Sequence, residues 1–268
     1  MGKTTKITIG SVQFNPLQKN GGENLERAVN YIELLVEKGV DLVLLPEMFN
    51  TGYGTDDETL QLATELYEET LETLSAIADY NDVAIIGGMI RKKTDRYFNS
   101  TVIVLPYREP VFYDKTHLFR DEKGVFSPGE KFVTFVYLDV TFGVVMCYEI
   151  GFPEISRILC KQSGAQVLLA PFAFGAERHR IYDVATRSRA MENGAFLVTS
   201  SQNGNSGKMN FIGKSRIVSP SGEIITEAGN AEGIILGKLD LGLVEKYRYR
   251  EVDDSHAYYA NFRNDLYK

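Results

Sequence analysis

The length, composition and charge of the chain indicate an ordinary globular protein. It has 268 residues, of which 44% are hydrophobic and 24% charged, and its formal net charge at pH 7 is -7. A chain of this length can bury a large apolar core in one domain, and no apolar run is long enough to cross a bilayer. The negative charge argues against a nucleic-acid partner, because it offers no electrostatic footprint for a phosphate backbone.

The N-terminal segment and the cysteines both favour a cytoplasmic location. MGKTTKITIGSVQF passes from a short basic lead directly into alternating strand residues, without the apolar stretch of a secretory signal. Cys147 and Cys160 are too few for a disulfide framework, and we expect both to be free thiols. The sequence therefore predicts a protein of the cytoplasm with no membrane partner.

The first half of the chain alternates between predicted strands and helices. Alternating apolar residues predict a strand at residues 6–14, and an apolar helical face predicts a helix at residues 24–38. The run DLVLL, closed by Pro46, is typical of a strand that is buried on both faces. A second helix is predicted at residues 58–80. Further predicted strands of this half lie at residues 83–90, 100–105 and 111–113.

The second half repeats this pattern. Strands are predicted at residues 142–146 and 166–170, the latter closed by Pro171, and helices at residues 153–162 and 177–192. The remaining predicted strands lie at residues 195–200, 211–218, 224–226 and 234–239. The alternation indicates an α/β protein with a sheet-rich centre and outer helices. We expect one domain over residues 1–268, with a tail of different composition from about Val244.

Cys147 ends one of the apolar predicted strands, directly before a predicted helix. Sites in α/β proteins are built where the carboxyl ends of strands meet helix N-termini, whose free N–H groups favour an anion. A reactive thiolate is reasonable at such a place, but a small buried apolar side chain fits the local sequence equally well. Cys160 lies in the middle of a predicted helix, where the structural interpretation dominates.

Glu47 and Lys115 are charged residues that directly follow apolar segments. The Glu47 carboxylate is either solvated at a sheet edge or held in a partly desolvated site where it can act as a base. Lys115, which follows the run VFYD, can equally be an ordinary lysine at a strand end. Taken separately, each residue therefore has a structural explanation.

Other kinds of site find little support. The histidines His117, His179 and His256 form no i,i+4 pair and have no cysteine cluster nearby, so a zinc site has no ligand set. A Cys–His pair using His117 or His179 stays open on spacing, although the local signatures of cysteine proteases are absent around Cys147. Neither a phosphate-binding loop nor a dinucleotide-binding motif is complete.

The strongest signal comes from three separated motifs: LLPEMFNTGY around Glu47, YDKTHLF around Lys115 and MCYEIGFPE around Cys147. Together they resemble the nitrilase superfamily of carbon-nitrogen hydrolases. The resemblance covers nearly the whole chain, because KGVFSPGE, RSRAMENGAFLVTSSQNG and FIGKSRIVSPSGEII also resemble family segments in order and spacing. Three motifs in the right order are far more specific than any one of them.

The resemblance implies a fold and an assembly. The implied fold is a four-layer α-β-β-α sandwich, and the implied assembly is a homodimer or a larger homo-oligomer. The tail segment HAYYANFRNDLY resembles a family extension that packs across a subunit interface, although such a segment equally suits docking within one chain.

The resemblance also implies catalytic roles. It makes Glu47 the general base, Lys115 the stabiliser of an oxyanion and Cys147 the nucleophile, and it puts Glu122 where some members have a second, substrate-orienting glutamate. The implied reaction cleaves the C–N bond of a small amide through a thioester on the cysteine and releases ammonia. Neither a metal nor an organic cofactor is expected.

Departures from the family pattern restrict the expected substrate. Members that hydrolyse N-carbamoyl amino acids resemble one another in having arginines three and four residues after the cysteine, where this chain has Ile150 and Gly151. Without that guanidinium fork an anionic substrate lacks a bidentate partner, so we expect a neutral or amine-bearing amide. Glu149 also stands where many relatives have Asp. Candidate pocket walls are Tyr53, Tyr148, Phe172 and Phe174.

Three alternatives to this amidase function stay open. A nitrilase, which acts on a C≡N group, and a hydrolase of N-carbamoyl amides would use the same residues. A non-catalytic scaffold protein would keep only the fold. The expected catalytic positions are all filled in this chain, which argues against the scaffold.

Overall fold

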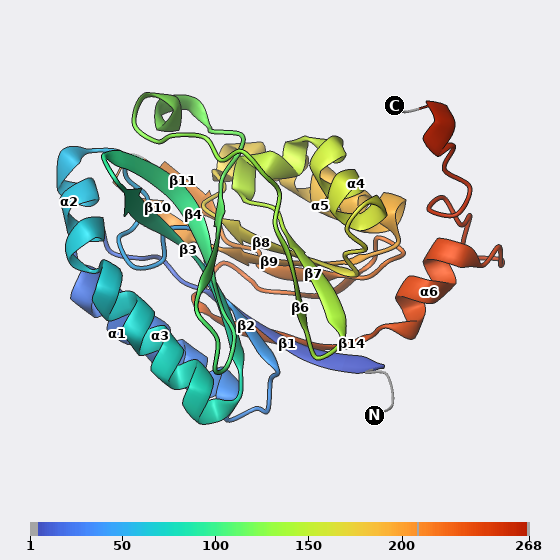
Figure 1. The fold of residues 1–268 in the computed structure, drawn as a ribbon, viewed down its shortest axis with the longest axis horizontal. Coiled ribbons are helices and arrows are strands. Elements are labelled where there is room, and N and C mark those ends of the chain that lie inside the picture. The colour runs from blue at the N-terminus through green and yellow to red at the C-terminus, as the bar shows by residue number, and fades with distance from the viewer. Residues whose placement is uncertain (1–4, 208, 267–268) are drawn as a thin grey trace.

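The computed structural model describes residues 5–207 and 209–266 and stacks two sheets between two layers of helices (Figure 1). The first sheet has the strand order β14-β1-β2-β3-β4-β5. Within it β1, β2 and β3 run parallel to one another, and the other neighbours are antiparallel. The bounds of its strands are β1 (Lys6–Gln13), β2 (Leu42–Leu44), β3 (Ala84–Lys93), β4 (Arg96–Val104), β5 (Val111–Asp114) and β14 (Gly233–Asp240).

The second sheet mirrors the first, with the strand order β13-β12-β9-β8-β7-β6 and a parallel centre of β7, β8 and β9. Its strands are β6 (Thr134–Tyr137), β7 (Val140–Val144), β8 (Val167–Phe172), β9 (Phe196–Ser201), β12 (Arg216–Val218) and β13 (Ile224–Glu227). A separate two-stranded ribbon pairs β10 (Asn203–Ser206) with β11 (Met209–Ile212).

Helices cover the outer face of each sheet. The longer helices are α1 (Gly21–Val36), α2 (Asp57–Glu65), α3 (Tyr67–Asn81), α4 (Pro153–Lys161), α5 (His179–Asn193) and α6 (Gly242–Tyr249). Short 3-10 helices lie at η1 (Arg120–Gly124), η2 (Cys147–Gly151), η3 (Ala176–Arg178) and η4 (Asn264–Leu266). Apolar side chains of α1 and α3 share a core with the first sheet, and those of α4 and α5 share one with the second. A third core lies between the two sheets.

The alternation of side chains along β8 shows how the sequence produces these layers. Val167 and Leu169 face the core between the sheets, whereas Leu168 and Ala170 face the core under α4 and α5. Successive residues of a strand point to opposite faces, so a strand between two cores needs apolar residues at every position. The continuous apolar runs of the sequence are these inner strands, and the predicted four-layer α-β-β-α sandwich is confirmed.

One predicted helix is two helices in the structure. The prediction of a single helix over residues 58–80 is wrong, because α2 and α3 are separated at Leu66, whose ψ of -5° departs from helical geometry. No proline or glycine marks the break in the sequence. The side chain of Leu66 is buried, so the bend lets α2 and α3 both pack against the rest of the molecule.

Two strand predictions also need correction. The strand expected over residues 211–218 is divided into β11 and β12 by Gly213 and Lys214, whose φ angles are +62° and +53°. Pro171 does not close β8, which continues to Phe172. The pairing of β7 with β8 ends at Leu169, so the strand has a free side for the missing N–H of the proline. The short strands β6 and β10 were not predicted.

The C-terminal segment docks within the chain. The helix α6 begins at Gly242, before the compositional change at Val244, and the segment after it packs on α4. The Tyr259 hydroxyl donates to the Cys160 carbonyl (3.1 Å), and Lys161 Nζ donates to the Tyr259 carbonyl (2.6 Å). These contacts hold part of the tail against α4 of the same chain and need no second subunit.

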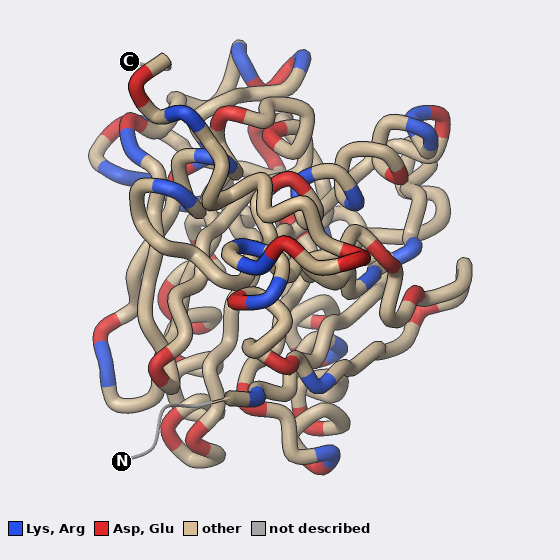
Figure 2. The backbone as a smooth tube through the Cα atoms, turned by 90° about the vertical axis from the view of Figure 1, so that its right-hand side faces the viewer, with Lys and Arg blue, Asp and Glu red and all other residues tan. Residues whose placement is uncertain are grey.

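In the part of the chain that the structure describes, no helix has both the length and the apolarity to span a bilayer. The predicted cytoplasmic location stays a prediction. In the view of Figure 2, Lys and Arg segments are interspersed with Asp and Glu segments. The expectation that the protein has no nucleic-acid partner stays a prediction.

Candidate active site

Segments that follow strands of both sheets meet at one end of the sandwich. Glu47 follows β2 and Lys115 follows β5 in the first sheet, while Cys147 follows β7 and Ala173 follows β8 in the second. The carboxyl ends of parallel strands are where α/β proteins build their sites. The fold therefore brings together side chains that are far apart in the sequence.

A buried cluster of two carboxylates and one ammonium lies at this end of the sandwich. Lys115 Nζ lies 2.8 Å from Glu47 Oε1 and 2.9 Å from Glu122 Oε1, and all three side chains are fully buried. The Asn99 amide donates to the same two oxygens, at 2.7 Å and 3.1 Å. The two glutamates are thus held together by a charge-assisted network.

The charge of Lys115 is retained in this cluster. Burial alone would lower the pKa of the amine, but the neighbouring carboxylates of Glu47 and Glu122 outweigh burial and hold that pKa well above its ordinary range. A permanent ammonium between two carboxylates leaves the cluster with an excess of negative charge. A further anion beside it is therefore disfavoured unless the site also takes up a proton.

Cys147 occupies a constrained turn. It is the first residue of η2, its φ is +43°, and 6% of its surface is exposed. A non-glycine residue in this left-handed region costs about 1–2 kcal/mol, and such residues cluster at functional sites. The turn is fixed by Glu149, whose Oε2 accepts a hydrogen bond from the Met146 N–H (2.9 Å).

The surroundings of Cys147 favour the neutral form of its thiol. Burial raises its pKa, and so does the Glu47 carboxylate, while Lys115 acts in the opposite direction without outweighing them. The backbone of Ala173 also hydrogen-bonds toward the thiol, and its N–H donates to Glu47 Oε2 at 2.8 Å. The thiol, one carboxylate oxygen of Glu47 and the ammonium of Lys115 therefore form one electrostatic unit.

Glu122 is held by a turn of the same design as the one that holds Cys147. In η1, Oε2 of Glu122 accepts a hydrogen bond from the Phe119 N–H (2.8 Å), and Arg120 has a φ of +42°. The Tyr53 hydroxyl donates to Glu122 Oε1 at 2.8 Å. Burial, followed by the charge of Glu122, raises the pKa of Tyr53 well above its ordinary value, so Tyr53 remains a hydrogen-bond donor.

Beside Cys147 lies a narrow apolar cavity of about 80 Å³. Two of the predicted pocket walls, Tyr148 and Phe174, line it. Tyr53 lies instead against Glu122. Phe172 does not line the cavity: it is fully buried on the face of β8 that packs under α5, with its ring 5.6 Å from that of Tyr182. The full lining is Phe119, Cys147, Tyr148, Ile150, Gly151, Ala173, Phe174, Arg178 and Ile181.

Glu149 is directed away from this cavity. Its Oε1 accepts hydrogen bonds from the Tyr113 hydroxyl (2.7 Å) and from the backbone N–H and hydroxyl of Thr116 (2.8 and 2.7 Å). Glu149 therefore ties the segment after Lys115 to the turn that carries Cys147. The longer acid at this position acts on the geometry of the two loops rather than on the shape of the cavity.

Four contributors to the site were missed by sequence reasoning. Asn99 bridges the glutamates, Ala173 contributes only a backbone N–H, and Gln202 Nε2 donates to the Glu47 carbonyl at 2.7 Å. Gly88 leaves room for Glu47, because a Cβ there would lie 2.4 Å from the Glu47 Cα. The isolated pair Gly87-Gly88 was a visible signal of this close approach.

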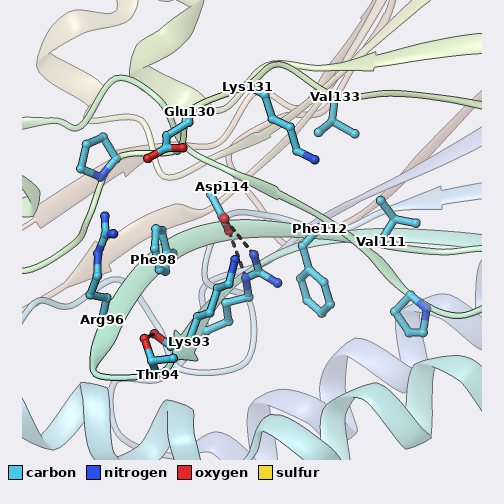
Figure 3. A pocket seen from close by; sticks show the side chains of 14 residues that line it. Lys93, Thr94, Arg96, Phe98, Val111, Phe112, Asp114, Glu130, Lys131 and Val133 are labelled. Carbon is cyan, nitrogen blue, oxygen red and sulfur yellow. Dashed lines mark hydrogen bonds and ion pairs between the residues drawn. The ribbon is translucent and has the colours of Figure 1, made fainter.

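A larger hollow of about 640 Å³ lies on the opposite face of β3, β4 and β5 (Figure 3). In it Arg91 pairs with Asp114 at 2.8 Å and stacks over the ring of Phe112. Asp114 and Lys115 are adjacent, and the backbone alternation sends one side chain to the hollow and the other to the cluster. The hollow has no cysteine among its lining residues, whereas the smaller cavity is lined by Cys147, so the candidate reaction centre is the cavity at Cys147.

Within residues 5–207 and 209–266, no group of three or more His, Cys, Asp or Glu side chains is arranged to hold a metal ion. The groups that converge beside the cavity are a thiol, two carboxylates and an ammonium. A buried cysteine next to a carboxylate and an ammonium, on an α-β-β-α sandwich, defines the class of cysteine-centred α/β hydrolases. Comparison with known proteins identifies the family within this class.

The family model for carbon-nitrogen hydrolases matches residues 8–249, and the chain belongs to that family. A protein named nitrilase from Pyrococcus abyssi is 33% identical over 92% of this chain and 95% of its own length. An (R)-stereoselective amidase from a Pseudomonas species is 33% identical, covering 90% and 88% of the two chains. The yeast omega-amidase NIT3 is 31% identical, covering 91% and 90%. The predicted family membership is confirmed.

Solved structures show the same fold. An amidase from Nesterenkonia superimposes with a TM-score of 0.85 at 23% identity, covering 100% of this chain and 97% of that one. A variant of that amidase, also with a TM-score of 0.85, carries the acetamide moiety of fluoroacetamide covalently on its active-site cysteine. The enzyme class, a carbon-nitrogen hydrolase, follows from the family and its members.

Proposed function

We propose that the protein hydrolyses the C–N bond of a small primary amide through a thioester on Cys147 and releases ammonia. The observation that carries this proposal is the cluster in which Lys115 bridges Glu47 and Glu122 beside a buried thiol. Amidases among the similar proteins support the same reaction. A small substrate suits the narrow cavity next to the sulfur.

In the first half of the reaction, the sulfur of Cys147 attacks the amide carbon while Glu47 accepts the thiol proton. Transferring the proton during the attack avoids a free thiolate beside two carboxylates, which the raised pKa of the thiol disfavours. The carbon–sulfur bond forms and the carbonyl oxygen becomes an oxyanion. Glu47 then gives its proton to the amide nitrogen, the C–N bond breaks, and ammonia leaves.

The oxyanion needs preorganised donors. We assign this role to the ammonium of Lys115 and to the backbone N–H of Tyr148, since the first N–H groups of a helix such as η2 have no acceptor within it. One donor of this kind contributes about 3–4 kcal/mol to transition-state stabilisation. To Glu122, which Tyr53 and Phe119 hold, we assign the orientation of the amide nitrogen and later of the water.

In the second half, water replaces ammonia. Glu47 removes a proton from the water, the resulting hydroxyl attacks the thioester carbon, and the carbon–sulfur bond breaks. The proton held by Glu47 returns to the sulfur as the carboxylic acid leaves. One amide and one water are consumed for each acid and ammonia produced, and the enzyme returns to its starting protonation state.

The test is ammonia release by the purified protein from short primary amides that are neutral, cationic or anionic. Cys147→Ala should abolish release because it removes the nucleophile. Cys160→Ala is the matched control, since Cys160 is a free, buried thiol of α4 that lies outside the cavity lining. Ammonia release that survives Cys147→Ala, or its absence from every amide with the wild-type protein, would refute the proposal.

The nitrilase alternative is decided in the same assay. A nitrile with the same acyl carbon skeleton as the best amide is offered beside it, and the acid product is quantified. A higher kcat/KM for the amide supports the amidase, whereas faster acid formation from the nitrile would assign the protein to nitrile hydrolysis. N-carbamoyl compounds in the panel test the third possibility.

We also propose that the protein forms a homo-oligomer. Val184 and Met191 lie two turns apart on the same side of α5, and 64% and 42% of their surfaces are exposed in the single chain. Exposed apolar residues on one helix face suit a contact with another copy. Sedimentation velocity on wild-type protein and on Val184→Glu should show a dimer or larger species that the variant weakens; a wild-type monomer would contradict the proposal.

A further inference from the structure

The hollow on the outer face of β3, β4 and β5 has no part in the proposed reaction (Figure 3). Three segments line it: the end of β3 with its turn into β4, the strand β5, and the residues before β6. Phe112 lines the hollow and also packs against the core that the first sheet shares with α1 and α3. The volume of about 640 Å³ falls in the range of about 300–1,000 Å³ that is usual for small-molecule sites.

The charge of this hollow has the opposite sign to that of the whole protein. The described residues of its lining include four cationic side chains and two acidic ones, whereas the chain carries a formal net charge of -7. The cations are Arg91, Lys93, Arg96 and Lys131, and the acids are Asp114 and Glu130. A concave surface with an excess of one sign of charge raises the local concentration of ions of the other sign. The hollow therefore favours an anion.

One cation and one acid of the lining neutralise each other. Arg91 donates to Asp114 through Nε at 3.0 Å and through Nη2 at 2.8 Å. The Ser100 hydroxyl donates to the same carboxylate at 2.7 Å. Because Asp114 is held by these donors, its charge is balanced within the protein and does not compete with a ligand for the remaining cations.

Three of the cations have donors available for a ligand. Within residues 5–207 and 209–266, the ammonium groups of Lys93 and Lys131 form no ion pair and donate no hydrogen bond. The Arg96 side chain uses only Nε in that part of the chain, donating to the Ser127 hydroxyl (2.8 Å), while it lies over the ring of Phe98 (5.2 Å). In the view of Figure 3, Lys93 reaches into the hollow from below and Lys131 from above.

The segment that carries Lys131 is fixed against β5. The Gly129 N–H donates to the Lys115 carbonyl at 2.9 Å. A Cβ at Gly129 would collide with the Asp114 carbonyl oxygen, so the two backbones approach as closely as only glycine allows. The backbone around the hollow is therefore in place before a ligand arrives, which lowers the ordering cost of binding.

The available groups define the chemistry of the ligand. Three cations face one acid, Glu130, that has no ion pair among the described residues, so a ligand needs at least two negative charges to balance them. Lysine ammonium groups are compact point charges that bind phosphate, without the planar fork that matches a carboxylate. Val111 and Val133 add apolar surface for an uncharged part of the molecule.

We propose that the hollow binds a small phosphate-bearing molecule with two or more negative charges, whose phosphate groups lie against Lys93, Arg96 and Lys131. This site is separate from the cavity beside Cys147, because no described residue lines both. The inference does not depend on the proposed amide hydrolysis, and binding can be measured without turnover.

Isothermal titration calorimetry on the purified protein, without divalent cations, tests the site with inorganic pyrophosphate, ATP, adenosine and citrate. Pyrophosphate and ATP should bind with one molecule per chain, and more weakly as salt rises, because the contacts are electrostatic. Adenosine lacks phosphate and citrate carries its charge on carboxylates, so both should bind more weakly. A Kd above about 1 mM for both phosphate compounds at low salt would overturn the inference. Adenosine or citrate binding as tightly as they do would overturn the assignment to phosphate.

Lys93→Gln combined with Lys131→Gln should weaken ATP binding by roughly 10- to 100-fold, because two charge-assisted contacts are lost. The matched control combines Lys38→Gln with Lys238→Gln. Both control lysines are exposed and lie outside the hollow, and their removal changes the net charge by the same amount. Unchanged binding in the hollow variant would contradict the inference, as would an equal loss in both variants, which would indicate attraction by overall charge.

A second measurement uses the wild-type protein and needs no substitution. Lysine acetylation by a dilute reagent is followed by peptide mass spectrometry with and without pyrophosphate. Bound phosphate should slow the acetylation of Lys93 and Lys131 and leave the rate at Lys38 unchanged. Equal rates with and without pyrophosphate at Lys93 and Lys131, or equal slowing at Lys38, would show that the phosphate does not occupy the hollow.

Discussion

At the scale of single residues, Asn99 contacts both carboxylates of the site, as Lys115 does. The Asn99 Nδ2 donates to Oε1 of Glu47 and to Oε1 of Glu122, the same atoms that Lys115 contacts. Because one amide group reaches both oxygens, Asn99 sets the separation of the two glutamates as well as their orientation. We expect it to act as a positioning residue for the reaction.

Asn99→Ala should reduce kcat/KM by roughly 10- to 100-fold, which corresponds to the loss of a hydrogen bond to a charged group, about 1.5–3 kcal/mol. The fall should appear mainly in kcat, since in the proposed reaction the glutamates act on the reacting atoms. Steady-state kinetics on the best amide measures it. Asn81→Ala, which removes only a bond to the Ile77 carbonyl at the end of α3, is the control. Equal effects of the two substitutions would mean that Asn99 has no special role.

The protonation of Cys147 gives a second prediction at this scale. Burial and the charge of Glu47 raise the pKa of this thiol, so the resting protein should show no thiolate from residue 147 at pH 7, nor at the ordinary thiol pKa of about 8.5. The difference in ultraviolet thiolate absorbance between wild type and Cys147→Ala, followed against pH, measures this. Cys160 does not interfere, because burial raises its pKa to about 11. A thiolate signal at pH 7 would contradict the electrostatics of the buried cluster.

At the scale of elements, the site depends on how closely β3 approaches the segment after β2. Gly88 in β3 faces the backbone of Glu47, and the Glu47 segment is also held by the Gly88 N–H, which donates to the Pro46 carbonyl at 3.0 Å. Because the backbone of Gly88 lies directly against the backbone of Glu47, no flexible side chain is there to move aside for a Cβ at residue 88. The carboxylate that we propose as the general base is therefore positioned by a strand to which we assign no catalytic residue.

Gly88→Ala should lower both activity and stability, because its methyl group would meet the Glu47 Cα at 2.4 Å and displace the carboxylate from Lys115. We expect destabilisation of about 1–3 kcal/mol, as for other overpacked sites. Urea unfolding and ammonia release measure the two effects. Gly22→Ala is the control, since nothing lies within 4 Å of its Cβ position in α1, and it should leave activity unchanged. A Gly88→Ala protein with normal activity would contradict the account.

The elements also show which features could be read from the sequence. The inner strands were predictable because burial on both faces requires unbroken apolar runs such as those of β2 and β8. The positions of Glu47 and Cys147 were predictable because each follows an apolar strand, β2 or β7, within a recognisable motif. Lys115 follows the edge strand β5 and was predictable from its motif alone. The break at Leu66 was not, since the sequence there contains no proline or glycine.

Other parts of the site lacked a sequence signal for physical reasons. Asn99 lies within an antiparallel strand rather than after one, and Ala173 acts through its backbone, which no residue type reveals. Arg178 enters the cavity only because η3 turns it back over Phe119 and Phe174. These contributions depend on contacts between segments that are distant in the sequence, and they appear only in the folded chain.

At the scale of the whole molecule, the core between the two sheets joins the halves of the chain. Ile9 and Leu44 of the first sheet belong to the same buried cluster as Phe142 and Val198 of the second. We propose that the chain therefore unfolds as one unit. Since the protein has no tryptophan, circular dichroism and tyrosine fluorescence should be followed together in urea. The two transitions should coincide; separate midpoints would indicate two domains.

Buried thiols should make the protein less stable at alkaline pH. The pKa of Cys160 is raised to about 11 by burial, whereas an unfolded thiol titrates near about 8.5. The stabilising contribution is complete below the unfolded value and is lost as pH rises through the folded value, a change of about 3 kcal/mol at most. The free energy of unfolding should fall less steeply between these limits in Cys160→Ala than in wild type. Parallel pH dependences would contradict this prediction.

The covalent intermediate on Cys147 is the most direct test of the account. The protein is mixed with an isotopically labelled amide and quenched in acid at times within the first turnovers, and intact-mass and peptide mass spectrometry locate the acyl group. The account predicts one acyl group per chain, attached to Cys147, absent from Cys147→Ala and present in Cys160→Ala. Substrate consumption at the normal rate without any acyl group on Cys147, or an acyl group on another residue, would contradict the central claim.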